Sequence, residues 1–150
     1  MALTKIIGEG IDGGTISTKT AGTGNLILGS TAGDSIASGG NYNTCVGDVA
    51  GTAITTGDRN VAVGYDALKT ATTASYCVAV GYQALENNTG NSNVAIGDQA
   101  LEACSSGTDN VAIGDDAGVA VTSGIKNTLI GSLAGDALTD ADENVAVGYN

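Results

Sequence analysis

The sequence predicts an all-β solenoid, a rod of short stacked coils, and three observations support this fold class. The motif Asn-x-x-x-Gly-x-x-Ala recurs every 16 to 18 residues from Asn25 onward in the 150-residue chain. Its Gly is present in all eight units, and its Ala is present in the seven complete units. Five Tyr are the only aromatic residues, which leaves little bulk for a globular core. A period this short and regular is typical of one coil per repeat.

The chain divides into two parts at the start of the repeat. Residues 1–24 precede the first motif and are expected to attach the protein or to cap the first coil. Residues 25–150 form the repeat domain of eight units, of which the last is incomplete. The first position of each unit is Asn, except for Cys77 in unit four.

A short strand is predicted at positions two to four of every unit. Positions two and four are mostly aliphatic, as in Val61 and Val63, which favours a strand. Position three is usually small, as in Ala62, Ala79, Ala95 and Ala112. Because alternate side chains of a strand point to opposite faces, this strand is expected to be buried on both. We expect positions two and four to fill the coil and the alanines to face another subunit.

The remainder of each unit is expected to turn, form a second strand and turn again. The Gly at position five predicts a bend, and the Ala at position eight packs inside. Positions ten to thirteen, such as Lys69 to Thr72, read as a second strand with an outward hydroxyl at position thirteen. Two strands and two turns describe a flattened parallel β-roll. With coils stacked about 4.8 Å apart, the eight units span roughly 34 Å.

Stacking also aligns the first positions into a ladder of amide side chains. This ladder includes Asn60, Asn93, Asn110 and Asn127. Such amides hydrogen-bond from coil to coil and satisfy the backbone of the turns. A binding surface is the alternative interpretation, and the structural one is favoured.

The small residues at position three favour several chains packed closely around one axis. Closed cyclic symmetry also removes an exposed apolar face. Residue spacing alone leaves two and three subunits open.

The motif resembles the head repeat of trimeric autotransporter adhesins and the related repeats of tailed-phage fibres. The similarity lies in the segments NVAVGYDAL, CVAVGYQAL, NVAIGDQAL and NVAIGDDAG, and the repeat covers residues 25–150. It implies a left-handed parallel β-roll, a homotrimer and an elongated surface rod. The coil is longer here than in the adhesin heads, so longer turns are expected.

Composition excludes several functions. The net charge of −11 opposes binding to nucleic acid or to anionic membranes. No run of residues reads as a signal peptide or a membrane span. The chain has no His, the usual general base, and its units lack the six-residue apolar phase of left-handed β-helix acyltransferases. No enzyme activity, cofactor or metal is expected. The three cysteines are interpreted as buried apolar residues.

Two surface columns at position six are candidate binding sites. Asp98 and Asp115, with Asp116 beside them, form an acidic shoulder that either holds a cation or is simply solvated. Tyr65 and Tyr82 either hold a sugar ring or form a packed aromatic ladder. The Ser/Thr column is not expected to bind ice, because neighbours such as Thr72 and Thr73 would point opposite ways along a strand.

The expected function is the structural shaft of a phage tail fibre or similar virion appendage that projects a receptor-binding element. The opening segment MALTKIIGEGIDGGTISTKTAG is similar to the starts of phage fibre proteins. The expected partners are two further copies of the chain, other fibre or virion proteins at the two ends, and a receptor on the host surface. The chain is expected to continue past Asn150 or to meet another protein there, because an open coil exposes a strand edge. The alternatives are a cell-surface adhesin and an end-to-end extracellular filament.

Overall fold

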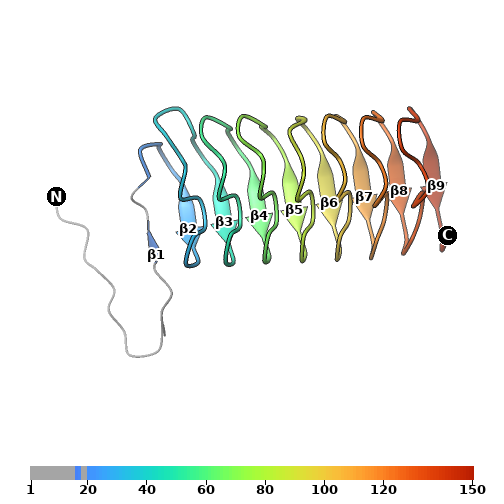
Figure 1. The fold of residues 1–150 in the computed structure, drawn as a ribbon, viewed down its shortest axis with the longest axis horizontal. Helices are drawn as coiled ribbons and strands as arrows, with labels where there is room; N and C mark the ends of the chain where they lie inside the picture. The colour runs from blue at the N-terminus through green and yellow to red at the C-terminus, as the bar shows by residue number, and fades with distance from the viewer. Residues whose placement is uncertain (1–15, 18–19) are drawn as a thin grey trace, which may run out of the picture.

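The computed structural model describes residues 16–17 and 20–150 and shows a parallel β-solenoid of about seven coils. Nine strands form one sheet in chain order, β1 to β9, along the long axis of the molecule (Figure 1). The first is β1 (Ile16–Ser17), and each later strand covers positions two to four of one unit. The later strands are β2 (Leu26–Leu28), β3 (Thr44–Val46), β4 (Val61–Val63), β5 (Val78–Val80), β6 (Val94–Ile96), β7 (Val111–Ile113), β8 (Thr128–Ile130) and β9 (Val145–Val147). No helix occurs in the described ranges. The predicted solenoid and its strand are confirmed.

The segment assigned to attachment or capping lies mostly outside the described residues, which omit 1–15 and 18–19. Within it, β1 pairs antiparallel with β2, with Ser17 opposite Ile27. This pairing covers the edge of the first coil's strand.

All later strands pair in parallel, with equal positions of the repeat side by side. Ala62 of β4 lies opposite Cys45 of β3 and Ala79 of β5. The Thr44 N–H donates to the Asn60 carbonyl at 2.8 Å, and the Gly64 N–H donates to the Val46 carbonyl at 2.8 Å. The even period thus becomes an unbroken ladder between coils.

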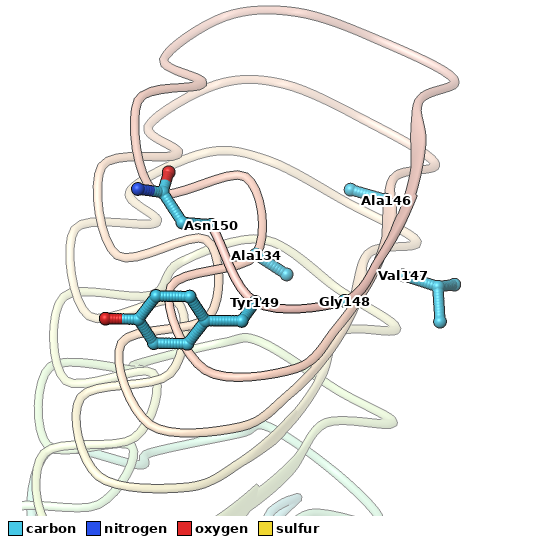
Figure 2. Close-up of a pocket in the computed structure, with 6 residues that line it drawn as sticks. All are labelled: Ala134, Ala146, Val147, Gly148, Tyr149 and Asn150. Atoms are coloured by element: carbon cyan, nitrogen blue, oxygen red, sulfur yellow. The ribbon is translucent and has the colours of Figure 1, made fainter.

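The strand faces are the reverse of the expected ones. The position-three alanines Ala62, Ala79, Ala95 and Ala112 are 0% exposed within the single chain and belong to its core. Ile96 and Ile113 at position four are 39% and 38% exposed and point outward. In the last coil, Ala146 points inward and Val147 points away from the roll (Figure 2). The prediction that these alanines form an intersubunit contact is therefore wrong. Alternation separates two faces, but only the direction of the following turn decides which is inside.

The predicted second strand is also absent. Positions ten to thirteen form turns in the described units. Positions seven and nine, which precede this segment, take the left-handed backbone conformation, with φ of 56° at Asp66 and 53° at Leu68. The N–H of position twelve then donates back to the carbonyl of position nine, as Cys104 does to Leu101 at 3.1 Å, so the segment starts as a turn. Thr72 and Thr73 lie outside any strand and are both exposed, so the strand alternation expected for them does not apply.

The glycine at position five is required for two reasons. Gly114 has φ 139°, a conformation that only Gly adopts readily. A Cβ atom there would also lie 2.5 Å from the Gly131 carbonyl of the next coil. The backbones of adjacent coils thus approach too closely for any side chain.

Inside the coil, the larger residue of a packed pair lies at position three in some units and at position nine in others. Units three to five combine Ala with Leu, as in Ala79 and Leu85, both 0% exposed. Unit one combines Ile27 with Gly33, and a Cβ atom on Gly33 would lie 2.7 Å from Ile27 Cδ1. These coils thereby fill a narrow interior with one large side chain.

Candidate functional surfaces

The asparagine ladder is an internal hydrogen-bond system. The Asn110 side-chain amide donates to the Gly124 carbonyl at 2.8 Å, across its own coil. Its Oδ1 accepts from the Asn127 backbone N–H at 2.9 Å and from the Asn127 side-chain amide at 3.0 Å. Asn60, Asn93, Asn110 and Asn127 are all fully buried. The ladder therefore closes and stacks the coils, and its amides do not reach a ligand.

Unit four carries its ladder amide at a different position of the coil. Cys77 occupies the Asn position, while Asn88 occupies position twelve, which is apolar in most units. The Asn88 amide donates to the Gly90 carbonyl at 2.8 Å, and its Oδ1 accepts from Asn93 at 3.0 Å. Asn88 therefore supplies, from the other side of the coil, the amide that Cys77 lacks.

A second ladder, missed in the sequence, uses polar side chains at position sixteen. Asp58 Oδ1 accepts from the Asn41 backbone N–H at 2.7 Å, and Ser75 Oγ accepts from the Asp58 N–H at 3.0 Å. Here the earlier coil donates to the later one, the opposite direction to the asparagine ladder. The sequence signal for this second ladder is the Asn, Asp or Ser that recurs near position sixteen in several units.

The two tyrosines of the predicted candidate site do come together. The rings of Tyr65 and Tyr82 are stacked with centroids 5.7 Å apart and an interplanar angle of 11°. They are 48% and 49% exposed. This pair is an aromatic surface open to solvent, in a parallel arrangement that favours mutual attraction.

Beside the tyrosines lies a chain of polar side chains from positions seven and ten. Gln99 donates to Gln83 Oε1 at 3.2 Å, and Gln83 donates to Glu86 Oε2 at 2.7 Å. Lys69 Nζ lies 3.1 Å from Glu86 Oε1 and 3.0 Å from Asp66 Oδ2. These two carboxylates raise the pKa of Lys69 well above its usual range, so the side chain stays charged.

A second aromatic cluster, not singled out from the sequence, lies at the last position of the unit. The Arg59 guanidinium lies between the rings of Tyr42 and Tyr76, 5.5 Å and 5.4 Å from their centroids. Arg59 also donates to the Tyr76 hydroxyl at 3.1 Å. The cation thus occupies the space between the two exposed rings.

The carboxylates of the acidic shoulder lie at the surface and repel one another. Asp98 and Asp115 are exposed, and Asp116 is partly buried. Desolvation and then the charges of Asp115, Asp98 and Asp136 raise the pKa of Asp116. Across the described part of the chain, no group of three or more acidic or Cys side chains is arranged to hold a metal ion.

The three cysteines are free and fully buried, as interpreted from the sequence. Burial raises the pKa of the Cys45 thiol to about 12 and that of Cys104 to about 11. Because the thiolate is the reactive form, these residues are unreactive in the folded protein.

The outer face of the sheet is apolar along its whole length. Positions two and four of the eight units carry Val, Ile or Leu, apart from Thr44 and Thr128, and none is charged. The most exposed of these in the interior strands are Ile96, Ile113 and Ile130. We call this surface the outer sheet face. A contiguous apolar stripe of this kind marks an interaction surface.

A cavity of ≈ 200 Å³ lies at the last coil, between Ala134 and residues 146–150 (Figure 2). It is the interior of the roll seen at its final turn.

Among the described residues, no helix has the length and hydropathy to cross a membrane.

Comparison with known proteins adds no relative. No family model, no curated protein and no solved structure matches the chain.

Proposed function

We propose that the protein is the homotrimeric structural shaft of a phage tail fibre or a similar virion appendage, and that its roll is left-handed. Its work is mechanical, because a stack of closely similar coils holds a receptor-binding element at a fixed distance from the particle. The left hand and the trimer come from the repeat's resemblance to adhesin heads and phage fibres.

The observation that carries this proposal is the outer sheet face. The interior of each coil is filled within one chain by residues such as Ala79 and Leu85, so the outer aliphatic side chains have no role in a single coil. A row of Val and Ile along the rod is suited to burial against copies of itself, and closed symmetry covers all of it. This interface replaces the one expected at the alanines.

The oligomer is tested by mass photometry of the purified protein, which should detect three chains. Ile113→Glu introduces a charge on the outer sheet face and should dissociate the trimer. Thr122→Glu, on an exposed turn of the same unit, is the matched control and should leave three chains. A stable monomer of the unaltered protein at micromolar concentration contradicts the trimer.

The location is tested by mass spectrometry of purified virions and by antibody labelling in electron microscopy. Labelled fibres support the proposal. The adhesin alternative instead expects the chain on cell surfaces. The filament alternative expects rods that lengthen with protein concentration.

A further inference from the structure

The stacked tyrosines, and a polar chain that includes the residue directly after Tyr82, both lie on units three to five. We define the tyrosine–amide surface as Tyr65, Tyr82, Gln83, Gln99 and Glu86. Tyr65, Tyr82 and Gln99 lie on three successive coils, and Gln83 and Glu86 share the coil of Tyr82. The surface therefore extends over three coils, which suits an extended ligand.

The polar part of this surface is held in place by its own hydrogen bonds. The chain runs from Gln99 to Gln83 to Glu86, at 3.2 Å and 2.7 Å. Lys69 anchors it at 3.1 Å from Glu86, and is itself bound at 3.0 Å to Asp66, which is only 4% exposed. Ordering these side chains before a ligand arrives reduces the entropy lost on binding.

We propose that the tyrosine–amide surface binds a neutral saccharide chain lying along the roll axis. The apolar face of a sugar ring packs on an exposed aromatic ring, and its hydroxyls pair with amides and carboxylates that both accept and donate. Tyr82 offers the ring, Gln83 and Glu86 offer polar partners in the same coil, and Gln99 offers one in the next coil. This inference goes beyond the proposed shaft function and does not depend on it.

The charge around the surface selects against anionic ligands. The column of Tyr65 and Tyr82 is preceded by Asp48 and followed by Asp98, both exposed. The whole chain carries a net charge of −11. Uronic or sialic acids and nucleic acid would meet like charges at both ends of the stack, so the ligand is uncharged.

The second aromatic cluster contains a cation and serves as a control. Arg59 lies between the rings of Tyr42 and Tyr76 and also donates to the Tyr76 hydroxyl, whereas the rings of Tyr65 and Tyr82 stack directly on each other. Its tyrosines are 57% and 56% exposed, so accessibility alone does not separate the two clusters.

The surface is placed to remain open when the outer sheet face is covered. In the last coil, Val147 points to one side of the roll and Tyr149, at the same position of its unit as Tyr82, points to another (Figure 2). A rod whose sheet face is buried thus still presents its position-six residues.

The experiment measures binding of three neutral linear hexasaccharides, from the cellulose, amylose and chitin series, to the full chain by saturation-transfer NMR and calorimetry. Oligogalacturonate of equal length is the anionic probe. We expect at least one neutral probe to bind with Kd near 1 mM or below, and Tyr82→Ala to weaken it by at least about tenfold. Gln83→Leu should weaken binding as well, while Tyr76→Ala should leave it unchanged.

The proposal is overturned by any of three results. These are no neutral hexasaccharide binding up to about 10 mM, stronger binding of oligogalacturonate, or an equal loss in Tyr76→Ala and Tyr82→Ala. Circular dichroism and mass photometry of each variant show whether the fold and the assembly are intact, so that lost binding is assigned to the surface alone.

Discussion

The coils at the centre and at the ends of the rod fill the same interior in different ways. Units three to five place Ala at position three and Leu at position nine, as in Ala79 and Leu85. Units one, two and seven place the larger residue at position three and Gly at position nine. Leu129 with Gly135 is an example, since a Cβ atom on Gly135 would lie 2.7 Å from Leu129 Cδ2. In these units the larger residue of the pair therefore lies at either position, and the other position holds a small one.

Unit six shows that the exchange also crosses coils. It has the small residue at both positions, Ala112 and Gly118. The space is filled from the neighbours, because a Cβ atom on Gly118 would lie 2.6 Å from Leu129 Cδ1 and 3.0 Å from Leu101 Cδ2. Unit four shows a similar compensation between positions for a hydrogen-bonding group, because Asn88 supplies the side-chain amide that Cys77 lacks.

The largest effect is expected from emptying a central coil. Leu85→Ala removes its fully buried large side chain, and should lower the free energy of unfolding by about 2–5 kcal/mol. The measurement is the urea midpoint at fixed protein concentration, which matters because an oligomer's stability depends on concentration. An effect below about 1 kcal/mol would show that the interior is not close-packed at this position.

Overfilling the same coil should cost less. Ala79→Leu places two leucines where the end coils hold one large residue and Gly, and should destabilise by about 1–3 kcal/mol. The control is Thr73→Leu at an exposed bend, away from the outer sheet face, with a change of at most about 0.5 kcal/mol. A neutral Ala79→Leu would contradict this pairing of a large residue with a small one.

Removing the Asn88 amide tests whether this residue compensates for the missing Asn at position 77. Asn88→Leu restores the usual apolar residue at position twelve, but leaves the Gly90 carbonyl to the weak Cys77 thiol donor at 3.3 Å. The expected loss is about 1–2 kcal/mol, and Cys77→Asn in the same chain should recover it. If the double variant is no more stable than Asn88→Leu, the two positions are not coupled.

The smallest effect is expected from converting a central coil into an end coil. Ala79→Leu combined with Leu85→Gly reproduces the pair found in unit seven. The double variant should lie within about 1 kcal/mol of the unaltered protein, since Gly also relieves the φ of 52° at Leu85. Thermal unfolding of the two single variants and the double variant gives the coupling energy. Additive losses would contradict the exchange.

The sequence predicts the period, the strand at positions two to four and the buried asparagine ladder, because each depends on a residue type that recurs in register. It does not reveal which strand face is inside, since Ala112 and Ile113 alternate equally well in either orientation. The second strand was predicted wrongly because non-Gly residues just before it, such as Leu68, adopt positive φ and lead the chain into a turn. The exchange of volume was visible in Ile27 with Gly33 and in Leu129 with Gly135, but only if the two positions are compared.

The stacked tyrosines were predictable as a column, since register alone places Tyr65 over Tyr82. The polar chain beside them was not, because it joins positions seven and ten of different coils. Those positions become neighbours only through the bends that the left-handed residues make. The separation of 16 residues between Gln83 and Gln99 is one repeat, so their contact can be predicted from the period. The contact between Gln83 and Glu86 can be recognised only in the folded structure.

The shared interior of units six and seven has a consequence for how the gene can lengthen. Units three, four and five each have Ala at position three and Leu at position nine. If one of them is copied or deleted, the units that become neighbours therefore have the same interior residues. Loss of unit seven would instead uncover the hollow beside Gly118 that Leu129 fills. We therefore expect the gain or loss of one coil to destabilise the rod less among units three to five than at unit seven, which thermal unfolding of length variants would measure.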